Sequence, residues 1–143
     1  IGWINADDKR LTQVVFNLLT NAINFTPKLG HIALAATRND DWIDITVSDS
    51  GPGIAKADRK RVLEPFGRVQ DGAHPNKGSS NGPGLGLTIV KRFVELHGGA
   101  VDIRSNKSRG TTVICRIPVD ADSVQGVASF DTDRATLDEH AAE

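Results

Sequence analysis

Four carboxamides recur at helical spacing within residues 11–25 (LTQVVFNLLTNAINF), at Gln13, Asn17, Asn21 and Asn24. At about 100° per residue they share an arc of roughly 80°, while apolar residues cover much of the remaining circumference. The pattern predicts a buried helix with one polar edge. Short amides are poor helix formers and are costly to bury without partners, so a row of them indicates a ligand. A solvated face or an amide network between helices explains this helix alone equally well.

A second candidate group is Asp49, which follows a predicted strand at residues 42–48 and precedes the glycine-containing turn at residues 50–54 (SGPGI). An ionised carboxylate only accepts hydrogen bonds, so Asp49 could accept from an exocyclic amino group such as N6 of adenine. The glycines in the turn permit close backbone approach or positive φ. This combination favours recognition of a base at the end of the strand.

A third candidate is the glycine-rich segment 82–87 (GPGLGL), which runs directly into a predicted helix at residues 88–99. Free N–H groups and the positive end of a helix dipole form a cradle for phosphates, and Asn21 offers an oxygen to a Mg²⁺ ion that bridges them. A dinucleotide-binding fold requires a strand directly before such glycines, and none is predicted here. The sequence also contains no GK[ST] phosphate loop. Residues 68–81 show no periodicity, which is typical of a lid or binding loop.

The elements that must position these groups follow the order strand or lead-in, helix, two strands, short helix, long loop, helix and two strands. Asp7 or Asp8 is predicted to cap the first helix, and Pro27 and Gly30 to end it. This order predicts an α/β two-layer sandwich, with a mixed, mainly antiparallel sheet covered on one face by about three helices. The remaining predicted elements are strands at 31–37, 42–48, 100–105 and 111–118, and a short basic helix at 55–64.

Composition describes one ordinary domain, with 143 residues, 38% hydrophobic content and a net charge of −1. Residues 120–143 hold seven acidic residues and one arginine, so their net charge is −6. Residues 1–119 therefore have a net charge of +5, and this mildly basic body suits an anionic ligand. Cys115 is the one cysteine, which excludes an internal disulfide, and we interpret it as a core residue rather than a nucleophile. No apolar run reaches the length of a membrane span, so a cytoplasmic setting is the default, and the abrupt start without Met suggests a piece of a longer protein.

Together these residues resemble the ATP-binding catalytic domain of bacterial sensor histidine kinases, within the wider superfamily of gyrase, heat-shock chaperone and mismatch-repair ATPases. The resemblance implies the Bergerat ATP-binding fold over residues 1–118. It does not cover residues 119–143, whose small, polar and acidic composition predicts a flexible tail. It rests on four motifs in the family's order: an N box at 17–27 (NLLTNAINFTP), a first glycine box at 49–53 (DSGPG), an F box at 64–68 (EPFGR) and a second glycine box at 82–87 (GPGLGL).

The resemblance implies a role for each motif in an ATP site. Asp49 is expected to hold the adenine amino group, in part through a water shared with Thr111, while the first glycine box lets the base approach. Phe66 is expected to anchor the lid, Arg68 and Lys77 to reach the phosphates, and the second glycine box to wrap the phosphate chain. The full set implied to bind ATP is Asn17, Asn21, Asn24, Asp49, Gly51, Gly53, Ile54, Phe66, Arg68, Lys77, Gly82, Gly84, Leu85, Gly86, Leu87 and Thr111.

Asn21 is similar to the family's Mg²⁺ ligand, and Asn17 stands where related ATPases carry a general-base glutamate. An amide cannot take a proton from water, so the site is expected to bind Mg-ATP without hydrolysing it rapidly. Two departures fall on the phosphate side: Asn24 replaces a common lysine, and Pro83 replaces a common threonine. They predict weaker nucleotide binding, and they leave open a degenerate kinase module that signals through conformation or protein docking.

The family's phosphoacceptor is a histidine on a separate helical dimerisation domain, expected before residue 1. The four histidines here, His31, His74, His97 and His140, lack the acceptor context. The implied partners are that helical domain and a response regulator or phosphotransfer protein, with a homodimeric full-length protein, a monomeric fragment and no nucleic acid. The F box argues against a serine kinase of the anti-sigma type. Asn17 argues against an ATPase of the gyrase or mismatch-repair type.

Overall fold

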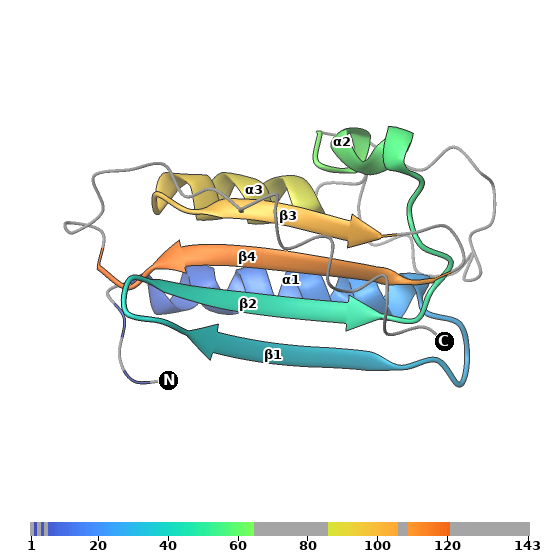
Figure 1. Cartoon of the computed structure of the whole chain (residues 1–143), viewed down its shortest axis with the longest axis horizontal. Coiled ribbons are helices and arrows are strands. Elements are labelled where there is room, and N and C mark those ends of the chain that lie inside the picture. The colour runs from blue at the N-terminus through green and yellow to red at the C-terminus, as the bar shows by residue number, and fades with distance from the viewer. Residues whose placement is uncertain (1, 3, 5, 65–85, 106–108, 121–143) are drawn as a thin grey trace.

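A computed structural model describes residues 2, 4, 6–64, 86–105 and 109–120 of the chain (Figure 1). Phe66, Arg68, Lys77, Gly82, Pro83, Gly84 and Leu85, and the acidic tail beyond residue 120, lie outside this described part. The elements are α1 (Asp8–Phe25), β1 (Ile32–Arg38), β2 (Trp42–Asp49), a 3₁₀ turn (Lys56–Asp58), α2 (Arg59–Val62), α3 (Gly86–Leu96), β3 (Ala100–Ser105) and β4 (Thr111–Pro118).

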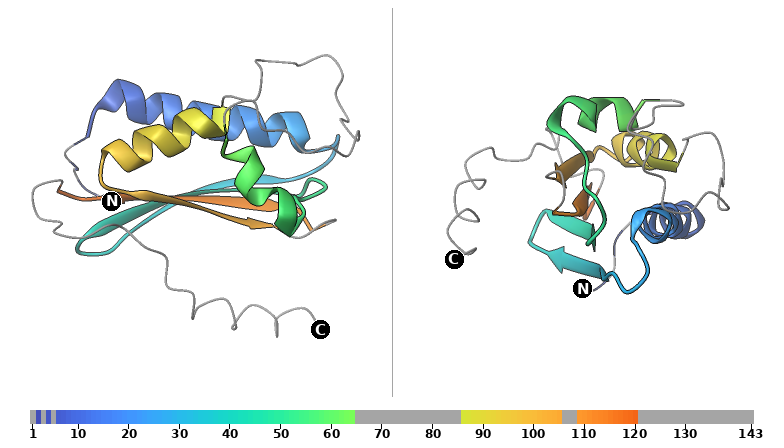
Figure 2. Two further views of the ribbon diagram at one scale, coloured as in Figure 1. Left: turned by 90° about the horizontal axis from the view of Figure 1, so that it is seen from above. Right: turned by 90° about the vertical axis from the view of Figure 1, so that its right-hand side faces the viewer.

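The four strands form one sheet in the order β1-β2-β4-β3, and each neighbouring pair is antiparallel. α1 and α3 lie side by side on one face of this sheet, as the view from above shows (Figure 2). The predicted two-layer sandwich is therefore confirmed. The observed order brings β2 and β4 together at the centre of the sheet, although more than 60 residues separate them in the sequence.

The core lies between the helices and the inner sheet face, and it follows from the two-residue period of the strands. Ile43, Ile45 and Val47 of β2 are buried and stand opposite buried residues of β4. Cys115 is one of these, with 0% of its surface exposed, and burial, with a smaller effect of the Asp44 charge, raises the pKa of its thiol to about 12. The thiol is protonated at neutral pH, which agrees with the interpretation of Cys115 as a core residue.

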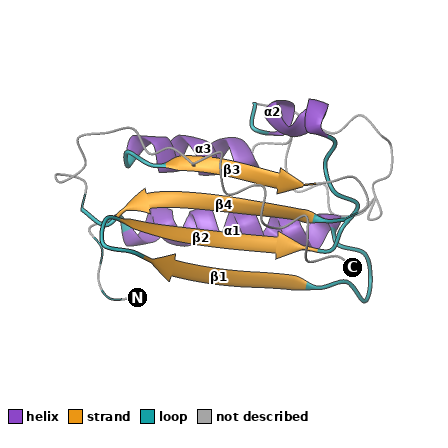
Figure 3. Cartoon of the chain, viewed as in Figure 1, coloured by secondary structure: helices purple, strands orange, loops and turns teal. Residues whose placement is uncertain are grey.

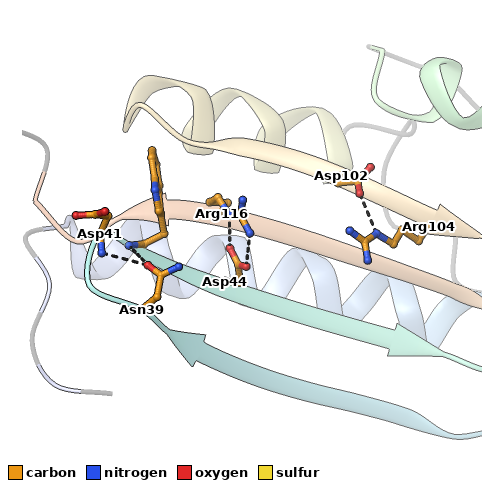
Figure 4. A network of polar contacts seen from close by, with 7 residues as sticks. Asn39, Asp41, Asp44, Asp102, Arg104 and Arg116 are labelled. Atoms are coloured by element: carbon orange, nitrogen blue, oxygen red, sulfur yellow. Dashed lines mark hydrogen bonds and ion pairs between the residues drawn. The ribbon is translucent and has the colours of Figure 1, made fainter. Parts of the chain in front are cut away.

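Polar side chains occupy the outer face of the sheet (Figure 4). Asp44 and Arg116 form a two-point ion pair across β2 and β4, with distances of 2.8 Å from Nε to Oδ1 and 2.7 Å from Nη2 to Oδ2. Arg104 donates to Asp102 at 3.1 Å along β3. A polar outer face is common for antiparallel sheets, and the alternation in β2 and β4 separates it from the core, whereas every residue of β1 is exposed.

α1 begins as predicted, because the Asp7 carboxylate accepts hydrogen bonds from the backbone N–H groups of Lys9 and Arg10. The expectation that the helix is buried around most of its circumference is wrong. Only one face packs on the sheet, and Phe16 and Ile23 on the far side are 66% and 60% exposed. In a two-layer sandwich nothing in the described part of the chain covers the outer side of a helix. None of the described helices is long and apolar enough to cross a membrane.

Candidate functional site

Asp49 ends β2 next to Thr111, its register partner at the start of β4. Its Oδ1 accepts a hydrogen bond from the backbone N–H of Gly51 at 2.8 Å. Burial raises the pKa of Asp49 above its ordinary value, and backbone N–H groups of Gly51 and Thr111 partly oppose this effect. The carboxylate is therefore held in one orientation and retains acceptor capacity, which is the geometry needed to receive an amino group.

The turn after Asp49 leaves no room for larger side chains at its first glycine. A Cβ at the buried Gly51 would stand 2.8 Å both from Asp49 Oδ1 and from the carbonyl oxygen of Phe25, the last residue of α1. Gly53 has φ of +75°, a conformation that glycine adopts without strain. The glycines thus bring the backbone of the turn against the end of α1, at the same end of the sheet as Asp49.

A residue missed by the sequence analysis links this turn to β4. Ser105, the last residue of β3, is 7% exposed, and its hydroxyl contacts three groups. It accepts from the N–H of Ile54 at 2.6 Å, donates to the carbonyl oxygen of Gly110 at 2.8 Å and lies 2.9 Å from Oγ1 of Thr111. The signal available in the sequence was a serine at an inward position of β3, where the alternation of Val101 and Ile103 leads one to expect an apolar residue.

The amide stripe of α1 runs toward this end. Gln13 is exposed, whereas Asn17, Asn21 and Asn24 are partly buried. The side-chain nitrogen of Asn17 is buried and has no hydrogen-bond partner within the described residues. A buried donor without a partner costs free energy, so its presence is evidence that a group not contained in the described chain satisfies it.

The amino end of α3 is directed toward the end of the sheet at which β2 finishes, and its carboxyl end lies at the opposite end (Figure 3). Gly86 is the first residue of this helix, and Leu87 is buried in the core. The first turn is tied to α2 by a hydrogen bond from Thr88 Oγ1 to the carbonyl oxygen of Leu63. The first N–H groups of a helix have no partner within the helix, so the amino end of α3 is the type of position at which proteins bind anions.

The described residues contain no group of three or more His, Cys, Asp or Glu side chains that could hold a metal. Mg²⁺ in nucleotide sites keeps several waters and phosphate oxygens and takes one or two protein ligands. The partly buried amide of Asn21 on the α1 stripe suits that sparing role. A small hollow between Arg10 of α1 and Leu96 of α3 lies at the other end of α1 and contains no comparable set of groups.

The chain belongs to the family of histidine kinase-, DNA gyrase B- and HSP90-like ATPases, whose model matches residues 6–121. Within that family it is an ATP-binding catalytic domain of the histidine-kinase type. It is 40% identical over 116 residues to the histidine protein kinase DivJ of Caulobacter vibrioides, covering 81% of this chain and 19% of DivJ. It is 34% identical over 115 residues to the adaptive-response sensory kinase SasA of a Synechococcus species, covering 80% of this chain and 29% of SasA.

Solved structures agree with this assignment. The sensor histidine kinase MprB from mycobacteria is 31% identical, with a TM-score of 0.66 over 79% of this chain and 72% of that chain. Full-length ShkA, solved in complex with AMPPNP, is 34% identical, with a TM-score of 0.67 over 80% of this chain and 22% of that chain. The chain therefore spans about a fifth of two of these full-length kinases, DivJ and ShkA, and most of the length of the MprB chain.

Proposed function

We propose that this domain binds Mg-ATP and presents its γ-phosphate to a histidine on a separate helical dimerisation domain of the same kinase. The observation that carries the proposal is the oriented carboxylate of Asp49, held by Gly51 N–H at the end of β2. The adenine amino group donates to this carboxylate, and a water shared with Thr111 completes the contact. The base enters over Gly51 and Gly53 and packs beside Ile54.

The phosphates extend from the base toward the amides of α1 and the amino end of α3. Asn21 would hold a Mg²⁺ ion, which would neutralise phosphate charge when it is bound. The buried side-chain nitrogen of Asn17 would donate a hydrogen bond to the bound nucleotide. Asn24, Gly86 and Leu87 flank the phosphate chain. The second glycine box (Gly82, Gly84 and Leu85) and the lid residues Phe66, Arg68 and Lys77 complete the grip on the phosphates.

Asn17 affects how fast the bound ATP is hydrolysed. A carboxamide does not accept a proton from water at neutral pH, so the site lacks a general base there and hydrolysis stays slow. The bound ATP is preserved for the histidine acceptor, and the phosphoryl group passes from it to a response regulator or phosphotransfer protein. The full-length protein acts as a homodimer, with its nucleotide site in the cytoplasm and no role for nucleic acid.

The test is a calorimetric titration of the chain with AMPPNP and Mg²⁺. We expect saturable binding that Asp49→Ala removes. Asp102→Ala is the matched control, since Asp102 is a partly exposed aspartate on the outer face of β3 and its loss should leave binding unchanged. Equal loss in both variants, both shown to be folded by circular dichroism, would contradict the assignment of the base site to Asp49.

A second candidate function is supported by Asn24 and Pro83, which remove a cation and an N–H from the phosphate side. In this alternative the domain binds nucleotide weakly or not at all and signals through conformation or protein docking. Absence of AMPPNP binding in folded wild-type protein would favour it over the kinase.

A further inference from the structure

The buried hydroxyl of Ser105 is shared by three neighbours, and its single proton determines the direction of each hydrogen bond. The Gly110 carbonyl can only accept, so the Ser105 proton is directed to it at 2.8 Å. The Ile54 N–H can only donate, and it approaches at 2.6 Å. The remaining contact, 2.9 Å to Thr111 Oγ1, must then be donated by Thr111.

Thr111 therefore has no hydroxyl proton left for a ligand. Its free lone pairs accept only, as do those of the ionised Asp49 carboxylate beside it. Two acceptors on these register partners are suited to a donor placed against them, such as an amino group, which they receive either directly or through a water that donates to both. They disfavour a carbonyl oxygen in that place, since an acceptor placed against acceptors leaves buried lone pairs unpaired.

Other contacts hold Ser105 itself in place. The Arg59 side chain donates a hydrogen bond to the backbone carbonyl of Ser105. The register partner of Ser105 in the sheet is Thr111. Gly110, whose carbonyl oxygen accepts the hydrogen bond from Ser105, has φ of +84°. A Cβ at this position would clash with the backbone carbonyl of Asp49. The serine, the glycine and the Asp49 backbone thus form one packed unit at the base end of the site.

We propose that Ser105 is a positioning residue for base selection: it holds the Thr111 hydroxyl as an acceptor, so that the site takes a purine with an amino group at position 6 and rejects one with a carbonyl there. This role rests on the proposed ATP site at Asp49. In Ser105→Ala the Thr111 proton is released and can turn to the ligand, which restores a donor for a carbonyl oxygen. Discrimination falls, whereas a purely structural serine would weaken the two nucleotides equally.

The experiment compares ATP with inosine triphosphate, which carries the carbonyl at position 6, by displacement of a fluorescent ATP analogue with Mg²⁺ present. For Ser105→Ala we expect the ratio of the two inhibition constants to fall about tenfold, a change of the size of one hydrogen bond. Ser105→Thr, which keeps the hydroxyl, should restore the ratio. Ser48→Ala is the control, because it removes a 2.9 Å contact to Thr112 one position along on the outer face.

Thr111→Val gives a second measurement if Ser105→Ala does not fold, since it removes the acceptor and keeps the β-branched shape. The ratio should fall in this variant as well. An unchanged ratio in folded Ser105→Ala or Thr111→Val, with selective wild-type protein, would overturn the role of Ser105 alone. Wild-type protein that binds neither nucleotide would overturn the ATP site, and with it the role of Ser105.

Discussion

Replacing Asn17 by leucine is expected to stabilise the nucleotide-free protein while it impairs the ATP site. The Asn17 side-chain nitrogen is buried without a partner among the described residues, and an unpaired buried donor costs about 1–3 kcal/mol. Leucine has a similar branched shape and is the better helix former by about 0.5 kcal/mol. The two effects together predict a gain of about 1.5–3.5 kcal/mol in the free energy of unfolding.

Asn21→Leu is the matched control, one helical turn along the same stripe and without an unpaired buried atom. It should gain only the helix-propensity difference. With an m-value of about 2 kcal/mol/M, urea denaturation should show a midpoint for Asn17→Leu raised by about 1 M, and one for Asn21→Leu raised by about 0.3 M or less. Equal midpoints for the two variants would refute the reasoning, because the Asn17 nitrogen would then already be satisfied.

Saturating Mg-AMPPNP connects this stability gain to function. A ligand at 100 times its dissociation constant stabilises the folded protein by about 2.7 kcal/mol. Wild-type protein should show such a rise in its urea midpoint. Asn17→Leu should show a smaller rise although it is the more stable protein without nucleotide, because the amide that the phosphate side requires is gone.

Three further perturbations test the base and phosphate ends. Affinity for AMPPNP should fall on acidification with a midpoint above pH 3.8, the ordinary pKa of an aspartate, because burial raises the pKa of Asp49. The same raised pKa stabilises the nucleotide-free protein at low pH, and this stabilisation is lost as pH rises through the raised pKa. Asp49→Asn should remove this acid limb in calorimetric titrations at several pH values. Gly110→Ala and Gly99→Ala each direct a Cβ into a strand carbonyl, so both should lower the free energy of unfolding, by about 1–3 kcal/mol for this clash. Only Gly110→Ala should also weaken AMPPNP binding, since it displaces Asp49; equal weakening by both would count against the site. Asn24→Lys combined with Pro83→Thr should tighten AMPPNP binding about tenfold or more, and an unchanged dissociation constant would rule out these residues as the cause of weak binding.

Local patterns in the sequence were sufficient to predict the elements and the motifs that they carry. The Asp7 cap, the period of the α1 stripe and the alternation in β2 involve residues a few positions apart, so they could be found without any knowledge of the fold. The glycine turn after Asp49 was likewise visible as a short motif, and the family resemblance gave it a role.

Only the tertiary structure decided which of these surfaces meet. It left Phe16 and Ile23 exposed on a helix that the sequence pattern predicted to be buried, because a helix in a two-layer sandwich buries one face. It also placed Ser105 against Ile54 and Thr111, through a register between β3 and β4 and a packing of loops that no local pattern specifies. Contacts between residues distant in sequence depend on how the strands align. The amino-acid sequence therefore determined which groups are available for nucleotide binding, and the fold determined which of their protons and lone pairs remain free.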